Sequence, residues 1–241
     1  MKRTMLSLLA AAWLLAPSSV LAQRNEPEPP RGGRVGWARL KNNSGHWKRH
    51  ARSDFVLSDF IRKQTSLNMD PTWFAADPAQ IESLAAYPVI FTNTISTLRD
   101  ERSRQNLAEY FKRGGFLIVD GCVNTGVTPD PDRFLDENRA ALLGMLPGGS
   151  VRELSKEHDL YTSYFALRLR PVHTQRQPYK QAWIRHGLYG VWDRHHRMVA
   201  VLGVSGFQCG WDGFGEPGGD IESMKTIVNI YVYAMTRSAD R

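Results

Sequence analysis

The stretch YFKRGGFLIVDGCVNTG, residues Tyr110–Gly126, decides the fold class of this chain. Its beginning is typical of a helix end, because a glycine pair at positions 114 and 115 follows a basic, amphipathic segment. The apolar run Phe116–Val119 then stops at Asp120-Gly121-Cys122, as a short buried strand does. The stretch therefore predicts a helix–turn–strand unit of an open α/β sheet. Its thiol follows the carboxyl end of the strand, where such sheets place ligands or chemistry.

Strands and helices alternate on both sides of this unit through the first half of the chain. Strands are expected at 34–40, 68–71, 89–92 and 116–120. Helices are expected at 53–65, from 78, from Asp100 and at 132–146. The helix at 53–65 should begin at Ser53 and bury Phe55, Leu57, Phe60 and Ile61. The alternation predicts a doubly wound α/β fold with a mainly parallel sheet.

The second half of the chain is richer in β structure. Strands are expected at 166–170, 182–186, 188–192 and 198–204, with a hairpin turn at Asp193–Arg197. The chain then continues into an amphipathic helix, whose apolar residues recur at helical spacing from Ile221 to Met235. This apolar face is expected to pack against the sheet.

The amino-terminal segment predicts export. Lys2 and Arg3 precede the apolar run Leu6–Leu15, which is too short to span a bilayer, and Val20-Leu21-Ala22 has the form of a cleavage site. We therefore expect a signal peptide at 1–22, a Pro-, Glu- and Arg-rich disordered leader at 23–33, and a single domain at 34–237. A periplasmic or secreted location follows, with no membrane span after removal of the signal.

Charge gives little indication of a partner. The formal net charge is +7, of which Lys2 and Arg3 supply two positive charges within the signal. The remaining basic residues are dispersed and form no dense run with exposed aromatic residues, so a nucleic-acid site is not expected. The expected partner is an unidentified small ligand or a protein of the cell envelope.

The two cysteines, Cys122 and Cys209, allow two hypotheses. In an oxidising compartment an even number of cysteines favours a disulfide, which requires their Cα atoms to lie within about 7 Å. Alternatively, Cys122 is a nucleophile, which needs a base oriented by a carboxylate. His158 with Asp159 is the candidate pair, 36 residues further on. A structural or disulfide-bonded cysteine is the favoured interpretation.

The segment Gly206–Asp220 is rich in glycine and acidic residues. Its carboxylates, Asp212, Glu216 and Asp220, are of the type that binds calcium, but their spacing is not that of an EF-hand. A long loop in which Asp220 caps the final helix is favoured. His46 and His50 are four residues apart, but they lie in a Lys/Arg-rich segment with no helix signal. No zinc motif, phosphate-binding loop or dinucleotide fingerprint is present, so neither a metal nor a cofactor is expected.

The positions expected to bind a ligand lie in two segments. Asp120, Gly121 and Asn124 follow the strand at 116–120, and Trp211 and Asp212 follow the strand at 198–204. Because the carboxyl ends of parallel strands share one edge of a sheet, the two segments are expected to lie at the same edge.

Several stretches, taken together and in order, resemble the bacterial domain-of-unknown-function family 4159 over roughly residues 34–237. They are Gly45-His46-Trp47, Tyr87-Pro88, Tyr110–Asp120, Leu154 to Tyr161, Gly190-Val191-Trp192 and Asn229–Ala234.

The resemblance implies a domain related to class I glutamine-amidotransferase-like proteins, which are flavodoxin-like three-layer sandwiches. It implies no particular reaction. This chain departs from the family pattern at His46, at Thr92-Asn93-Thr94 and at Asp159. It also lacks the G-x-C-x-G spacing around Cys122 and the carboxyl-terminal His-x-Glu of amidotransferases.

These observations favour an exported, non-catalytic module of the cell envelope that binds a ligand or a protein. The alternative is a cysteine-dependent hydrolase or transferase that uses Cys122.

Overall fold

The structure, a computed structural model, describes residues 33–122, 130–167, 187–212 and 221–237. The expected signal peptide, nearly all of the expected leader and the expected strand at 182–186 lie outside these residues. So do Asn124, Glu216 and Asp220. Among the described residues, no helix combines the length and the apolar character that a membrane span requires.

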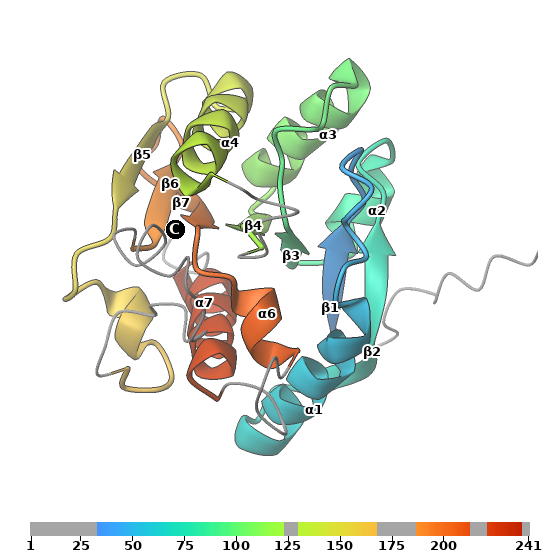
Figure 1. Ribbon diagram of the computed structural model, residues 1–241, viewed down its shortest axis with the longest axis vertical. Coiled ribbons are helices and arrows are strands. Elements are labelled where there is room, and N and C mark those ends of the chain that lie inside the picture. The colour runs from blue at the N-terminus through green and yellow to red at the C-terminus, as the bar shows by residue number, and fades with distance from the viewer. Residues whose placement is uncertain (1–32, 123–129, 168–186, 213–220, 238–241) are drawn as a thin grey trace, which may run out of the picture.

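One seven-stranded sheet forms the centre of the fold, in the order β2-β1-β3-β4-β7-β6-β5 (Figure 1). The strands are β1 (Val35–Leu40), β2 (Met69–Ala76), β3 (Val89–Thr92), β4 (Phe116–Asp120), β5 (Ser150–Glu153), β6 (Tyr189–Trp192) and β7 (Met198–Gly203). The first five strands in the spatial order are parallel, whereas β6 and β5 are antiparallel to their neighbours. The parallel part has the flavodoxin-like order, with β7 in the place of the fifth strand.

Helices cover both faces of this sheet (Figure 1). They are η1 (Ala51–Ser53), α1 (Asp54–Gln64), α2 (Ile81–Ala85), α3 (Glu101–Lys112), α4 (Pro131–Met145), η2 (Asp159–Thr162), α6 (Phe207–Trp211) and α7 (Ile221–Arg237). Helices α2, α3 and α4 pack on one face, and α1 and α7 with η2 pack on the other. The expected three-layer α/β sandwich with a mainly parallel sheet is thereby confirmed.

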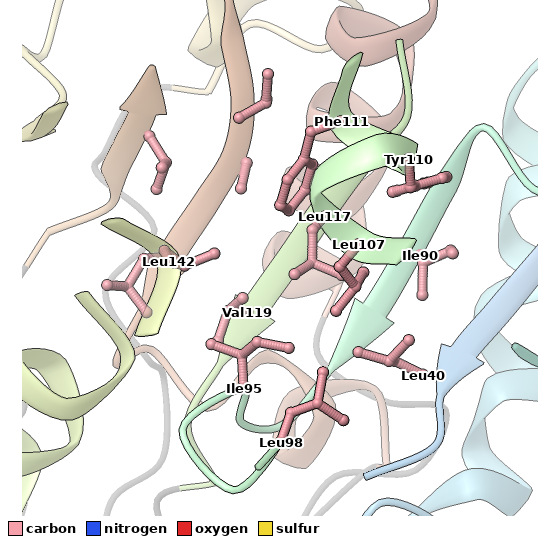
Figure 2. Packing of buried hydrophobic residues seen from close by; sticks show 14 of the residues in the cluster. Leu40, Ile90, Ile95, Leu98, Leu107, Tyr110, Phe111, Leu117, Val119 and Leu142 are labelled. Carbon is pink, nitrogen blue, oxygen red and sulfur yellow. The ribbon is translucent and has the colours of Figure 1, made fainter. Parts of the chain in front are cut away.

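Strand β4 shows how the two cores arise from one short apolar run. Leu117 and Val119 point into the core beneath α3 and α4 (Figure 2). Phe116 and Ile118 point into the core beneath α1 and α7. Successive side chains of a strand alternate between faces, so a strand that is covered on both sides must be apolar throughout. The continuous apolar run of the sequence is the direct result.

The junction between α3 and β4 is tightly packed. Gly114 ends the helix with a positive φ of 97°, which glycine adopts at little cost. Gly115 lies against the ring of Tyr110, where an added Cβ would be 2.2 Å from a ring carbon. The Tyr110 hydroxyl in turn lies 3.0–3.1 Å from the carbonyl oxygens of Tyr87, Pro88 and Phe116. The aromatic ring is therefore held between two strands.

Most expected elements are present, but some differ. Strands β3 and β4 and the β6–β7 hairpin lie where they were expected, and Asp100 caps α3 through the N–H of Ser103. Strand β2 is longer than expected, and β5 and α6 were not expected. Ala166 and Leu167, the described part of the expected strand 166–170, are not in a strand.

The buried face of α1 is another correction. It consists of Asp54, Leu57, Ser58 and Ile61, and Phe55 is 48% exposed. Positions 54, 57, 58 and 61 lie three or four residues apart and therefore share one face of the helix, whereas position 55 points away from it. The expectation for Phe55 was wrong because the inward position is taken by an acidic residue, Asp54, which the fold pairs with a buried arginine.

Candidate functional site

Three segments that follow parallel strands meet at the carboxyl edge of the sheet. Cys122 lies two residues beyond β4, Cys209 lies on α6 after β7, and His50 lies in the segment that joins β1 to η1. One ligand atom from each of these side chains lies within 4.8 Å of those of the other two. We call His50, Cys122, Cys209 and Asp212 the carboxyl-edge site. Its position is the one at which open α/β sheets bind ligands.

The two cysteine side chains are in contact. Their sulfur atoms lie 3.5 Å apart, and both residues are buried. The structure holds them as two thiols without a covalent S–S bond. The two thiols are therefore neighbours, and the disulfide expected from the sequence stays a prediction.

His50 lies between a thiol and a carboxylate. Its Nδ1 is hydrogen-bonded to Oδ2 of Asp212, and its side chain is also hydrogen-bonded to Cys122. Burial lowers the pKa of His50, but the contacts with Cys122 and Asp212 outweigh it, so that the pKa is raised above its ordinary value of 6.5. His50 also has a left-handed backbone, with φ of 57°. Such a conformation is uncommon for a residue other than glycine and is found preferentially at functional sites.

Asp212 is held by two partners. While Oδ2 contacts His50, Oδ1 accepts a hydrogen bond from the hydroxyl of Ser53. Ser53 occupies the N-cap position of α1, as expected, but its side chain makes no capping hydrogen bond there. Its hydroxyl is used to position Asp212 instead.

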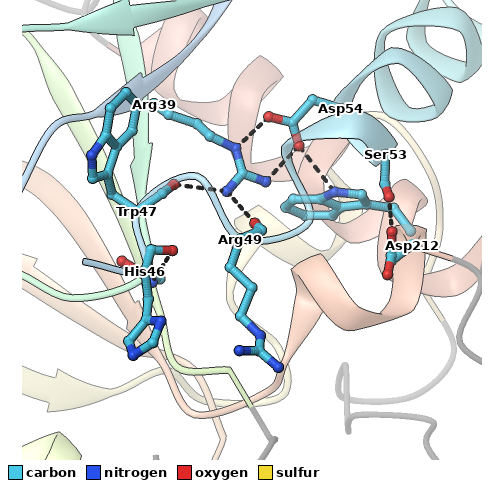
Figure 3. Close-up of polar contacts among 9 residues, drawn as sticks. Arg39, His46, Trp47, Arg49, Ser53, Asp54 and Asp212 are labelled. Carbon is cyan, nitrogen blue, oxygen red and sulfur yellow. Dashed lines mark hydrogen bonds and ion pairs between the residues drawn. The ribbon is translucent and has the colours of Figure 1, made fainter. Parts of the chain in front are cut away.

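A buried ion pair holds the backbone around the site (Figure 3). Arg39, the next-to-last residue of β1, forms a two-pronged ion pair with Asp54, in which Nε and one terminal nitrogen of the guanidinium each donate to one carboxylate oxygen. Both side chains are buried. The guanidinium also donates to the carbonyl oxygens of Trp47 and Arg49, at 3.1 and 2.8 Å. Arg39 therefore fixes the segment that carries His50.

The same pair also holds α6. The indole nitrogen of Trp211 donates to Oδ1 of Asp54 over 3.1 Å, and its ring packs edge-on against Trp37 and Phe91. Trp211 was expected to bind a ligand, but it is 1% exposed and lies in the core. Its hydrogen bond to Asp54 helps to place Cys209, on the same helix, and Asp212, which directly follows the helix.

Asp120 and Gly121, also expected to bind a ligand, make contacts within the protein. The Asp120 carboxylate accepts hydrogen bonds from the backbone N–H groups of Ser205, Gly206 and Phe207, and so orders the turn between β7 and α6. Burial raises the pKa of Asp120 to about 7, although these N–H groups favour its charged form. Gly121 lies against the ring of Phe134.

His158 and Asp159 lie at the start of η2. The Nδ1 atom of His158 accepts a hydrogen bond from the N–H of Leu160, and its ring packs against Tyr233 of α7. The imidazole that the structure brings to the Cys122 thiol is that of His50.

Two buried polar side chains follow β7 in the segment that leads to Cys209. Gln208 is completely buried, and neither atom of its amide has a hydrogen-bond partner among the described residues. The hydroxyl of Ser205 likewise has no hydrogen-bond partner among the residues that the structure describes. Because buried polar groups are nearly always hydrogen-bonded, these groups mark a region suited to a polar ligand or water.

A cavity of about 950 Å³ lies elsewhere, between α3, the end of α4 and the β6–β7 turn. Its lining includes Arg104, Lys112, Arg194 and Arg197 together with Glu101. It is separate from the carboxyl-edge site, because the β6–β7 turn leads into the start of β7 rather than following its end. It contains no cysteine and none of the residues of the site.

The sequence alone did not indicate the roles of His50, Ser53 and Arg39. One signal was present: Arg39 interrupts an otherwise apolar strand, and a charge in a buried strand needs a partner. That partner, Asp54, is 15 residues away. The proximity of His50 to Cys122 had no local signal.

The fold and the site together define an α/β domain of the flavodoxin-like order with a thiol–imidazole–carboxylate group at its carboxyl edge. The model of one family, Domain of unknown function (DUF4159), matches residues 37–235. The chain therefore belongs to the DUF4159 family. The comparison with curated proteins finds no match.

Proposed function

We propose that this DUF4159 domain is an exported module of the cell envelope that binds a ligand at its carboxyl-edge site. The observation that carries the proposal is the convergence of His50, Cys122, Cys209 and Asp212 from three separate segments of the fold. Packed interiors do not gather polar side chains without compensation, because each carries a desolvation cost. The amide of Gln208, the residue before Cys209, adds support, because it is buried and has no hydrogen-bond partner among the described residues.

The strand order supports a relationship to the class I glutamine-amidotransferase-like domains. The sequence of residues 1–22 supports export. Expression in a bacterial host, followed by fractionation and mass spectrometry, tests export. We expect a periplasmic or secreted protein that begins at Gln23. A full-length protein in the cytoplasm would contradict this part of the proposal.

A thermal-shift screen of a fragment library against the mature protein tests the site. We expect the melting-temperature shifts of true ligands to disappear in the Asp212→Asn and Gln208→Leu variants. They should persist in Arg194→Ala, which alters the separate cavity. If the shifts disappear in Arg194→Ala but persist in Asp212→Asn and Gln208→Leu, the ligands bind in that cavity and not at the carboxyl-edge site.

A second candidate function has one specific observation in its favour. The order Cys122–His50–Asp212 is that of a thiol nucleophile, its base and the carboxylate that orients the base. The domain would then be a thiol-dependent hydrolase or transferase. Iodoacetamide labelling of the native protein across pH, with the labelled sites mapped by mass spectrometry, tests the reactivity of Cys122. Turnover of thioester or amide substrates that Cys122→Ser abolishes would replace the binding proposal by this one.

A further inference from the structure

We propose that the carboxyl-edge site binds a zinc ion through Sγ of Cys122, Sγ of Cys209 and a ring nitrogen of His50. The inference rests on the proposed function, because it names the ligand of the same site. It differs from the expectation drawn from the sequence, in which no metal motif was recognised.

The distances between the ligand atoms suit a tetrahedral ion. With zinc–sulfur bonds of about 2.3 Å, two thiolates of a tetrahedral site lie roughly 3.8 Å apart. The sulfur atoms of Cys122 and Cys209 lie 3.5 Å apart, and the atoms of all three residues lie within 4.8 Å of one another. A disulfide would require the sulfur atoms to approach to about 2.05 Å. The observed separation is closer to the metal-bound value.

The donor atoms determine which metal is expected. Thiolate and imidazole ligands suit zinc and monovalent copper, whereas calcium and magnesium require oxygen ligands. Two thiolates balance the charge of one divalent ion, and their two protons pass to solvent when the ion binds. The carboxylate of Asp212, which a calcium site would need, is already engaged by His50 and Ser53.

Asp212 acts as a positioning residue for the imidazole. Because a carboxylate accepts hydrogen bonds, Nδ1 of His50 donates to it, and this tautomer places the lone pair of the ring on Nε2. When the ion binds, the hydrogen bond between the imidazole and Cys122 is replaced by bonds to the metal as the thiol loses its proton. Histidines that bind metals commonly donate their other ring N–H to a carboxylate in this way. Ser53 holds the second oxygen of the same carboxylate and thus limits its rotation.

The frame around the ligands is rigid. Arg39 holds the backbone just before His50 through its hydrogen bonds to two carbonyl oxygens. Asp54 holds the indole of Trp211, which lies two residues beyond Cys209. A metal site needs such support, because its ligands must be held within a narrow range of positions. Three protein ligands leave the fourth position of a tetrahedral ion for a water or a ligand atom, as in zinc sites that remain open.

Metal content and cobalt substitution test the proposal. The mature protein is purified with a phosphine reductant, loaded with zinc, dialysed and measured by mass spectrometry of the elements. We expect one zinc per chain. Replacement by Co²⁺ should give a thiolate-to-cobalt charge-transfer band in the near ultraviolet and the visible bands of a tetrahedral ion.

Variants assign the ligands. Cys122→Ser and Cys209→Ser should each weaken the charge-transfer band and remove stoichiometric zinc, and His50→Ala should also remove the zinc. His46→Ala is the matched control, because His46 is an exposed histidine of the same segment and should leave zinc binding unchanged. Asp212→Asn should lower the zinc affinity about 10–100-fold while one zinc still binds at saturation. Circular dichroism confirms that each variant is folded.

Three results would overturn the inference: no zinc in the reduced wild-type protein, a cobalt spectrum without a thiolate band, or zinc retained in the Cys122→Ser/Cys209→Ser double variant. A native protein that contains a Cys122–Cys209 disulfide, and binds no zinc after reduction, would assign the pair to a structural bridge. In these cases the fragment screen still decides the proposed function, since its readout requires no metal.

Discussion

The buried pair of Arg39 and Asp54 connects several of the segments around this site. It joins β1 to α1, and its remaining hydrogen bonds reach the carbonyls of Trp47 and Arg49 and the indole of Trp211. A buried ion pair adds little stability relative to apolar residues of similar size, but removal of one partner leaves a buried charge. The value of this pair therefore lies in positioning the segments that carry the site.

Arg39→Met should destabilise the protein by about 3–5 kcal/mol, because it leaves the Asp54 carboxylate buried without its cation. The double variant Arg39→Met/Asp54→Leu should recover a large part of this loss. Urea unfolding followed by tryptophan fluorescence measures both. A double variant as unstable as the single one would show that the pair contributes through packing rather than charge.

Asp193 gives the hairpin turn a dependence on pH. Burial alone would raise the pKa of Asp193, but N–H groups of Arg197 and His195 and the Arg197 guanidinium lower it below the ordinary value of 3.8. A carboxylate with a lowered pKa stabilises the folded state above its ordinary pKa, and this contribution is lost as the pH falls through the lower, folded value.

We therefore expect wild type to be more stable than Asp193→Asn near neutral pH, and the difference to shrink as the pH falls below 3.8. Denaturant unfolding of both proteins over a pH series measures this. A difference that stays constant with pH would mean that the carboxylate charge has no part in holding the turn. The carboxylate is partly exposed, so the effect is expected to be small.

At the scale of elements, the α3–β4 junction depends on one glycine. The Tyr110 ring occupies the space beside Gly115, and contacts with three carbonyl oxygens hold that ring in place. Gly144, on α4, has a different neighbour: an added Cβ would meet only the end of the Arg104 side chain, at 2.8 Å. A flexible side chain can move away, whereas a ring fixed between two strands cannot.

Gly115→Ala should therefore cost roughly 1–3 kcal/mol, the usual range for overpacking a core. Gly144→Ala should be neutral or stabilise the protein by up to about 1 kcal/mol, because alanine is the better helix former. Thermal and urea unfolding of the two variants provide the comparison. Equal effects of the two substitutions would contradict the view that Tyr110 is immobile.

Helix α6 is the element that completes the site. It contains only five residues and begins after Gly206, which has a left-handed conformation. It presents Cys209 three residues before Asp212. The backbone N–H groups at its start are bound by the Asp120 carboxylate at the end of β4. The Asp120 side chain thus connects the carboxyl ends of the neighbouring strands β4 and β7, two residues before Cys122.

At the scale of the molecule, the zinc site would connect segments that are distant in sequence. His50, Cys122 and Cys209 follow β1, β4 and β7, so an ion bound to all three bridges the parallel part of the sheet. A ligand that binds only the folded state stabilises it in proportion to the logarithm of its concentration over its dissociation constant.

Zinc at about 100 times its dissociation constant should raise the free energy of unfolding by about 2.7 kcal/mol. For a domain of this size that corresponds to roughly 5–11 °C in the melting temperature. Differential scanning calorimetry of the reduced protein measures the shift. The His46→Ala control should keep it and Cys122→Ser should lose it; an equal shift in both variants would indicate binding elsewhere.

The sequence by itself determined the alternation of elements and the two-sided burial of the central strands. A strand covered on both faces must be apolar throughout, and a helix must bury one stripe, so both patterns are local and readable. The glycine pair before β4 and the turn at Asp193–Arg197 are local in the same sense. These features were enough to predict the fold class and the edge at which Cys122 lies.

Only the tertiary structure decided which side chains meet there. His50 and Cys122 are 72 positions apart, Asp212 contacts His50 across 162, and Cys209 lies 87 residues beyond Cys122. Periodicity and capping rules extend over a few residues, so they do not relate segments that become neighbours only through the order of strands in a sheet. The sequence thus identified Cys122 as the residue to test, and the packing of β1, β4 and β7 supplied its partners.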